Sequence, residues 1–435
     1  MTVPRLCVLA LGVAVTALPA AAAHGQVRSS PRPIRIGLLT NCTGAWGRQA
    51  DNSLAGAELA LIQAGARAAG ANPMDGVLGA AILHRPIRLS IGCTNGTTVS
   101  ALKEARRLVE GAHVDIVIGP LLGNEEFALQ AYARLHPATA FVNGSGSVRL
   151  PDPAPNFFSF HGDGAQWSAG LGSYAYHVLG WRHAVAVTDD YDAFSWSQTA
   201  GFLAEFCSLG GIILKRVGVP SGSPDLSAVI AQVPHSGVDG IYVASNSDVA
   251  RTLMKVYPAL RGNAATRLLV GNFSVGWLSF HPSNRLKGFV WDQRIGPGGL
   301  PAGRFETALH AHFAKLDPAT ASTFDVDYYV AMQATLQALR ASNGDLSHGE
   351  RRFLAALARV RLNTPNGPVR LDKTHQAITT AYLWQVRKSR FSHAKLLKTI
   401  PNVERTFGGY LTSHDPPPSL STPTCRQGHV PRWAS

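Results

Sequence analysis

The sequence predicts an α/β fold with two doubly wound lobes, each built on a mainly parallel sheet with helices on both faces. Short apolar runs typical of buried strands alternate with helical runs along most of the chain, a pattern that favours parallel sheets. The 435 residues are too many for one ordinary hydrophobic core. A proline-rich break at 151–155 divides the alternating pattern into two sets.

The first set contains four strands in regular alternation with helices, which predicts parallel pairing and right-handed crossovers. The expected strands are Arg35–Leu39, Ile87–Gly92, Asp115–Gly119 and Ala140–Asn143, and the expected helices are Ser53–Ala69, Thr98–Glu110 and Asn124–Leu135.

The second set repeats this alternation after the break. Its expected strands are Ala184–Thr188, Gly211–Arg216, Gly240–Ala244 and Leu268–Gly271, and its expected helices are Ala165–Leu179, Trp196–Leu209, Leu226–Val233 and Asp248–Leu260. Helices are expected next at Phe305–Lys315, Asp327–Ser342 and Phe353–Arg361, followed by strands at Gly367–Leu371 and Ala381–Val386.

This order predicts that the chain crosses between the lobes three times. We expect a first lobe from 33–156 plus 292–366, a second lobe from 157–291 plus 367–415, and a C-terminal tail at 416–435. Several short crossovers predict a hinge with a cleft between the lobes.

Residues 1–23 have the pattern of a secretory signal peptide. Arg5 is followed by an apolar run from Leu6 to Leu18 and then by the small residues Ala20–Ala23. The run is too short for a membrane span. We therefore expect a soluble product exported across the inner membrane into the periplasm.

Four cysteines follow this segment: Cys42, Cys93, Cys207 and Cys425. An even number in an oxidising compartment favours two disulfides. Cys42 and Cys93 follow successive strands, which are neighbours with parallel ends in a doubly wound sheet, so we expect them to pair. A Cys207–Cys425 disulfide would then join the tail to a helix.

The net charge of +13 admits a nucleic-acid partner or simply a basic surface. Lysine and arginine are scattered, and no recognition motif accompanies them. We favour a basic surface that attracts anionic ligands or membrane faces, and expect no nucleic-acid partner.

A loop of small residues follows the fourth strand, from Gly144 to Ser147. It resembles the start of a dinucleotide-binding motif, but Arg149 stands where the third glycine belongs. Hydroxyl groups and backbone N–H groups at a strand exit suit a carboxylate or amide, although an ordinary tight turn would have the same residues.

Catalytic and metal chemistry has little support in the sequence. Ser274 is not in a nucleophile elbow, and the side chains of His310 and His312 diverge on one helix beside Glu306. We therefore expect no enzyme, no cofactor and no metal. Aromatic residues near strand exits, which include Trp196, could line a cleft or merely pack.

The chain resembles the type I periplasmic substrate-binding proteins of the branched-chain amino acid, amide and urea group, which serve ABC importers. The likeness runs from Pro33 to about Phe391, and four motifs carry it: Ile36–Ala60, Val117–Pro120, Tyr328–Met332 and Gly367–Ala377. It implies two Rossmann-like lobes joined by three crossovers, the type I clamshell, which closes on a ligand.

The resemblance also implies ligand-binding positions on both lobes. These are Trp46, Gly123, Ser145, Ser147 and Phe324 on the first lobe, and Phe194, Asn246 and Phe273 on the second. Two positions depart from the family pattern. Phe273 stands near where amino acid binders carry an acidic residue, and Gly123 stands where serine is common.

The resemblance implies capture of a small polar or carboxylate-bearing ligand, such as an amino acid, an amide, or an aromatic or aliphatic acid. The expected partners are the permease subunits of an ABC importer, with the binding protein as a monomer. A sensor that presents its ligand to a membrane receptor or kinase is the alternative.

Overall fold

The computed structural model describes residue 1 and residues 32–220, 225–245, 249–260, 264–271, 286–293, 300–316, 323–387 and 394–435. The expected signal peptide, apart from Met1, lies outside the described residues. Arg32–Ser435 forms one compact unit that contains two large sheets.

The first sheet has six strands in the order β4-β5-β1-β6-β7-β8. They are β1 Ile34–Asn41, β4 Ala81–Ile82, β5 Arg85–Thr94, β6 Ile116–Ile118, β7 Ala140–Asn143 and β8 Phe157–Ser159. Only β4 runs antiparallel to its neighbour. A small separate ribbon joins β2 Arg67–Ala68 and β3 Val77–Leu78.

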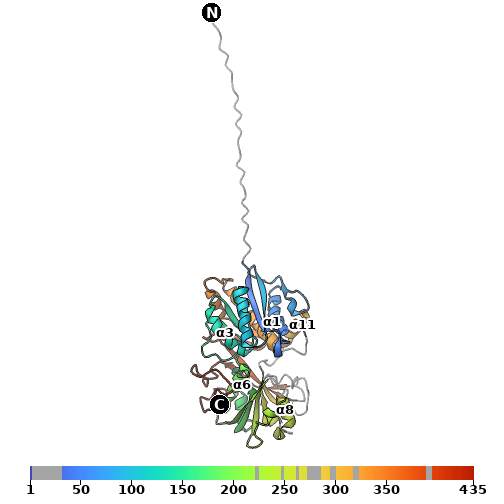
Figure 1. Ribbon diagram of the computed structural model, residues 1–435, viewed down its shortest axis with the longest axis vertical. Coiled ribbons are helices and arrows are strands. Elements are labelled where there is room, and N and C mark those ends of the chain that lie inside the picture. The colour runs from blue at the N-terminus through green and yellow to red at the C-terminus, as the bar shows by residue number, and fades with distance from the viewer. Residues whose placement is uncertain are drawn as a thin grey trace. The chain divides into compact units, whose positions relative to one another are not determined.

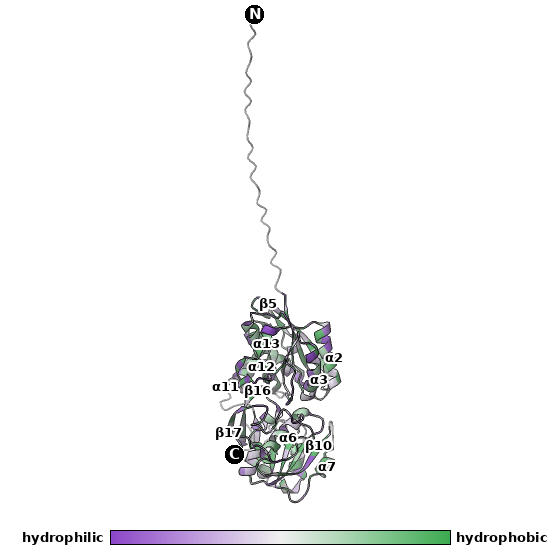
Figure 2. Cartoon of the chain, turned by 90° about the vertical axis from the view of Figure 1, so that its left-hand side faces the viewer, coloured by the Kyte–Doolittle hydropathy of each residue, from purple (hydrophilic) through white to green (hydrophobic). Residues whose placement is uncertain are grey.

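Helices cover both faces of this sheet. They are α1 Gln49–Gln63, α2 Thr98–Arg106, α3 Gly123–Leu135, α11 Leu300–His312, α12 Thr323–Ala341 and α13 Arg351–Leu357. Figure 2 shows α12 and α13 on one side of the sheet and α2 and α3 on the other. Successive strand residues therefore enter different cores: Ile36 and Leu38 pack with α1 and α12, whereas Leu39 packs beneath α2 and α3.

The second sheet has the order β10-β9-β11-β12-β13-β16-β15-β14, and β17 also pairs with β16. The strands are β9 His183–Asp189, β10 Ile212–Val219, β11 Gly240–Ala244, β12 Leu268–Val270, β13 Val290–Gln293, β14 Arg361–Thr364, β15 Gly367–Leu371, β16 Ala377–Val386 and β17 Ala394–Val403. Strands β9–β13 pair in parallel, and β14–β17 pair antiparallel.

The helices of this part are α4 Gly164–Trp167, α5 Leu171–His177, α6 Ala193–Phe206, α7 Ser227–Ile230, α8 Val249–Val256 and α9 Ala264–Arg267. Figure 1 labels α6 and α8 beside the second sheet. On β9, Ala184 and Ala186 pack toward α6, while Val185 and Val187 join the core of α8. A sheet buried on both faces is what the apolar runs in the sequence predict, and the expected fold class is confirmed.

Three local expectations differ from the structure. The helix expected at 165–179 is two helices, because Gly170 adopts a left-handed backbone with φ of 95°. The helix expected to reach Arg361 ends at Leu357, and β14 begins at Arg361. Strand β17 was not expected, because its mostly exposed or half-buried residues lack an apolar run.

Both expected disulfides are present. Cys42 pairs with Cys93 across the ends of β1 and β5, which are parallel neighbours, with 5.1 Å between the Cα atoms. Cys207 pairs with Cys425 and ties the tail to the end of α6. Within the described part of the chain, no helix is both long enough and apolar enough to cross a bilayer.

The contact between α1 and α12 depends on a glycine. A Cβ atom on Gly56 would lie 1.9 Å from the backbone oxygen of Asp325, so only glycine allows the two helices to approach this closely. Gly303, in α11, is exposed and a Cβ atom there would meet nothing within 4 Å.

We predict that Gly56→Ala lowers the free energy of unfolding by about 1–3 kcal/mol, because the new methyl group must push α12 away. Gly303→Ala is the matched control, and we expect it to be neutral or to stabilise by up to about 1 kcal/mol, since alanine favours helix. Urea unfolding of the two variants measures both values. Equal stability of the two would contradict the close packing of α1 on α12.

Candidate functional site

Three of the expected ligand-binding segments meet where α3 begins. A Cβ atom on Gly123, the first residue of α3, would lie 2.4 Å from Val148 Cγ1 and 2.7 Å from Gly146 O. The same atom would lie 3.3 Å from the backbone nitrogen of Phe194, in α6. A side chain at this position would not fit unless the loop moved, which explains the glycine.

Ser145 and Ser147 lie in the loop after β7, and each is only 1% exposed. The Ser145 backbone N–H donates to Asn143 Oδ1 at 2.7 Å, and its hydroxyl donates to Asp327 Oδ2 at 3.1 Å. The Ser147 hydroxyl has no hydrogen-bond partner among the described residues. The loop therefore presents a buried polar group at a strand exit, where open α/β sheets bind ligands.

A buried pair of a histidine and an aspartate lies beside this loop. His161 Nε2 is 3.0 Å from Asp327 Oδ2, and both side chains are almost fully buried. Asp327 belongs to α12, whereas His161 follows β8 on the first crossover toward the second sheet. Because Asp327 also accepts from Ser145, the loop, the helix and the crossover are held together.

Two aromatic rings pack against His161 from the second part of the chain. Its ring centroid lies 5.0 Å from that of Trp167 and 5.9 Å from that of Phe194. Trp167 and Phe194 pack edge to face at 5.3 Å. The sequence predicts Phe194 as a ligand-binding position, but it does not predict His161, Asp327 or Trp167. Asp327 directly precedes the Tyr328–Met332 motif, and this position next to a family motif could have identified it as a site residue.

The other expected aromatic pair lies on the first lobe. Trp46, in the short turn Gly44–Trp46 after β1, is half-buried and packs edge to face on buried Phe324 at 5.7 Å. Two further expected positions, Asn246 and Phe273, lie outside the described residues.

Acidic groups on the second sheet are engaged by this chain's own donors. Asp189, at the end of β9, accepts from the Ser245 hydroxyl at 2.6 Å and from the Ser195 hydroxyl at 3.2 Å. Asp192 caps α6 and accepts from the backbone N–H groups of Phe194 and Ser195 at 3.3 and 3.1 Å. Asp192 is therefore used to begin the helix that carries Phe194.

A buried glutamic acid, Glu126 of α3, forms hydrogen bonds that hold the serine loop. Glu126 Oε2 accepts from the Val148 backbone N–H at 2.7 Å, and Oε1 lies 2.9 Å from the Ser159 hydroxyl. Burial raises the pKa of Glu126 to about 8, against the lowering effect of these hydrogen bonds. Glu126 is therefore mainly protonated at neutral pH, so the group that holds the loop carries no charge.

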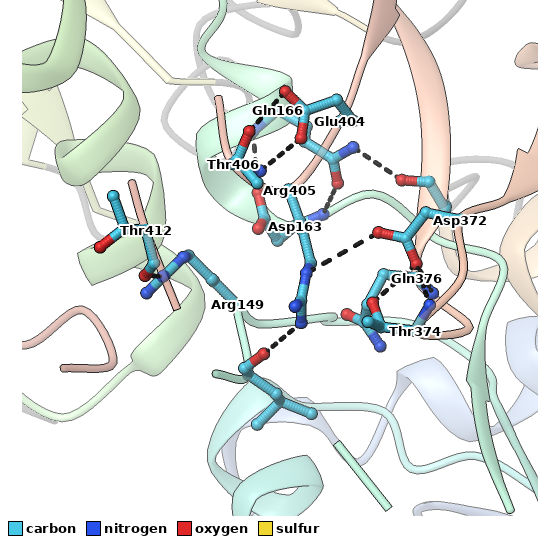
Figure 3. Close-up of polar contacts among 12 residues, drawn as sticks. Arg149, Asp163, Gln166, Asp372, Thr374, Gln376, Glu404, Arg405, Thr406 and Thr412 are labelled. Carbon is cyan, nitrogen blue, oxygen red and sulfur yellow. Dashed lines mark hydrogen bonds and ion pairs between the residues drawn. The ribbon is translucent and has the colours of Figure 1, made fainter. Parts of the chain in front are cut away.

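Polar side chains join the crossover segments to one another, as Figure 3 shows. Gln166 Nε2 donates to Ala377 O at 2.8 Å and to Val403 O at 2.7 Å, which links α4 to β16 and β17. Arg405 Nε lies 3.7 Å from Asp372 Oδ2, in the turn before β16. These contacts join α4 to β16 and β17 and hold the turn before β16.

The segment 404–415, which follows β17, extends this network to the serine loop. The Arg149 guanidinium, two residues after Ser147, donates to backbone oxygens of Thr412 and Asp415, and Arg405 Nη1 donates to Leu150 O at 2.6 Å. The loop is thus held by Glu126 and by this segment. Among the described residues, no group of three or more His, Cys, Asp or Glu side chains could hold a metal ion.

Two α/β lobes with a polar loop at a strand exit define a binding protein. The sequence profile of a family described as periplasmic binding protein matches residues 33–390, so the chain belongs to the periplasmic binding protein family. This confirms the expected family. Its members are binding proteins, which agrees with the expectation that the chain is not an enzyme.

Solved structures share the fold. An ABC transporter substrate-binding protein from Sphaerobacter thermophilus has a TM-score of 0.70 at 22% identity, covering 85% of this chain and 98% of its own. A leucine-binding protein from Thermotoga maritima has a TM-score of 0.68 at 18% identity, with coverage of 85% and 99%.

A solute-binding protein of an ABC transporter from Rhodopseudomonas palustris, solved with 3,4-dihydroxybenzoic acid, has a TM-score of 0.70 at 16% identity, with coverage of 86% and 98%. At these identities the likeness shows the fold alone. No curated protein matches the sequence.

We predict that stability falls between about pH 4.5 and pH 8 in a manner that depends on Glu126. Over this range the unfolded chain, with an ordinary pKa of 4.5, releases a proton that the folded state keeps. The folded state thus loses relative stability as pH rises, by about 1.4 kcal/mol per pH unit for one proton. Urea unfolding at pH 5, 6, 7 and 8 measures the slope.

Glu126→Gln copies the protonated acid and should reduce that slope by the contribution of one proton, while Glu306→Gln, at an exposed position, should leave it unchanged. A slope in Glu126→Gln as steep as that of the unaltered protein would show that Glu126 is not the group responsible.

Proposed function

We propose that this protein captures a small aromatic carboxylic acid between its lobes in the periplasm and delivers it to an ABC importer. The observation that carries the proposal is the buried Ser147 hydroxyl, which has no partner among the described residues. Leaving a buried hydroxyl unbonded costs about 1–3 kcal/mol. A ligand carboxylate that accepts from Ser147 would remove this cost.

The location of Ser147 also favours a ligand. The loop follows β7 at the edge where the parallel strands end, and Gly123 leaves room for backbone to approach it. Phe194, from α6, approaches Gly123 on the same side. A ligand held by Ser147 and covered by Phe194 would contact both lobes, and such shared contact is what shifts a hinged protein toward its closed state.

The acidic groups argue for a ligand without an α-ammonium group. A buried ammonium requires a carboxylate partner. Asp327 lies beside His161 and accepts from Ser145, Asp189 accepts from two serine hydroxyls, and Asp192 caps α6. Each of these carboxylates already serves the protein's own donors.

Aromatic side chains at the expected binding positions favour an aromatic body on that acid. Trp167 and Phe194 pack beside His161, and Trp46 packs on Phe324. Planar ligands gain from offset or edge-to-face contacts with such rings. Structures with this fold include Rhodopseudomonas palustris solute-binding proteins in complex with benzoate and with 4-hydroxybenzoate.

Delivery to an importer rests on the family and on the fold. The similar Sphaerobacter protein is described as an ABC transporter substrate-binding protein. The expected partners of this chain are therefore the permease subunits of such a transporter.

We predict that benzoate and its hydroxylated forms raise the melting temperature of the mature protein, whereas leucine, isoleucine, amides and urea do not. Ligand at 100 times Kd should add about 2.7 kcal/mol of stability. A thermal-shift screen followed by calorimetric titration measures this. Stabilisation by leucine or isoleucine alone would overturn the aromatic-acid proposal and would mean that one of the carboxylates serves an ammonium.

We predict that Ser147→Ala weakens benzoate binding about 10- to 150-fold, the equivalent of one hydrogen bond to a charged group. Its stability without ligand should be unchanged or slightly higher, because no protein partner in the described chain loses a bond. Ser145→Ala, whose hydroxyl bonds Asp327, should instead lose about 1 kcal/mol of stability. Calorimetric titration and urea unfolding separate the two effects, and unchanged affinity in Ser147→Ala would remove this serine from the site.

A further inference from the structure

A pocket of about 280 Å³ lies on the strands β14 to β17, and none of its residues belongs to the candidate ligand site. It is lined by Arg361, Leu362, Asn363, Pro368, Val369, Arg370, Ile378, Thr379, Thr380 and Asn402. We call it the arginine pocket. Its lining contains two cationic side chains, several neutral donors and no acidic residue.

The two arginines lie directly opposite each other. Arg361 of β14 is in register with Arg370 of β15, and Arg370 is in register with Ile378 of β16. Directly opposed residues project on the same face with Cβ atoms about 4.5–5.5 Å apart, and like charges so placed destabilise a sheet. Among the described residues, no carboxylate forms an ion pair with either guanidinium.

The nearest acidic residues along the chain are engaged elsewhere. Asp372 pairs with Arg405 and accepts from the backbone and hydroxyl of Thr374 at 2.8 and 2.7 Å. Glu404 accepts from the hydroxyl and backbone of Thr406 at 2.7 and 2.6 Å. Both carboxylates therefore hold their own turns, and the charge of the pocket stays positive.

Further donors converge on the same place. Arg370 Nη2 donates to Asn402 Oδ1 at 3.4 Å, which leaves the amide nitrogen of Asn402 as a donor. Arg432 Nη2 donates to Asn402 O at 3.2 Å and brings a third guanidinium beside the pocket. Planar guanidinium groups bind phosphate oxygens in pairs, and adjacent amides and hydroxyls complete such sites.

We propose that the arginine pocket binds a phosphate group, supplied either by a soluble phosphate compound or by the headgroup of an anionic phospholipid. A dianion between Arg361 and Arg370 neutralises two opposed charges, and Asn402 and Thr380 supply further donors. This second site is independent of the carboxylic acid proposed for the serine loop, because the two share no residue.

The test uses the full mature chain and a double variant, Arg361→Gln with Arg370→Gln. The control is Arg88→Gln with Arg106→Gln, which removes the same charge from two exposed arginines outside the pocket. Calorimetric titration with inorganic phosphate forms one arm. Sedimentation with vesicles of phosphatidylcholine, with and without phosphatidylglycerol, forms the other.

We expect the unaltered protein and the control to bind alike, and the double variant to bind at least tenfold more weakly. Loss in the phosphate arm supports a soluble compound as the source, and loss in the phosphatidylglycerol arm alone supports the lipid headgroup. If the double variant matches the unaltered protein in both arms, whether both bind or neither does, the proposal is overturned.

Stability provides a readout that separates binding from a structural role. Without phosphate, Arg361→Gln alone should raise the melting temperature, because it removes the repulsion across β14 and β15. Phosphate should then raise the melting temperature of the unaltered protein and not that of Arg361→Gln. Equal stabilisation of both by phosphate would also overturn the proposal.

Discussion

The carboxyl ends of parallel strands reach the same edge of a sheet, and the candidate site of this protein depends on that constraint. Ser145 and Ser147 follow β7, Gly123 comes after β6, and Asp189 ends β9. Apart from Ser145 and Ser147, which share one loop, these residues lie far apart in the sequence. Gly123 and the loop of Ser145 and Ser147 meet because β6 and β7, which precede them, are parallel neighbours. Helices cover both faces of each sheet and hold the strand ends in place.

Burial also determines the charge of the groups that support the site. Glu126 is kept neutral by desolvation and bears the loop, whereas the Asp327–His161 pair joins that loop to a crossover segment. A paired and hydrogen-bonded carboxylate can be buried without leaving an isolated charge. The serine loop is thus supported by the neutral Glu126 and by the paired Asp327. The charge of a ligand would then meet hydrogen-bond donors that the protein already holds in place.

The fold was largely predictable from the sequence, because period and length alone distinguish buried parallel strands from helices. The Cys42–Cys93 pairing followed from strand order as well. The antiparallel strands β14 and β17 were missed, since residues such as Arg361 and Lys395 interrupt the apolar pattern on half-exposed strands. Contacts such as His161 with Asp327 could not be derived, because single residues 166 positions apart carry no spacing signal before the fold is known.

The Cys207–Cys425 disulfide closes a covalent loop with a sequence separation of 218 residues, and this loop contains most of the second sheet. One backbone cleavage anywhere inside it leaves two fragments that are still covalently joined. Such a nicked molecule keeps its full mass until a reductant is added. For this protein, an intact band under oxidising conditions is therefore not proof of an intact backbone.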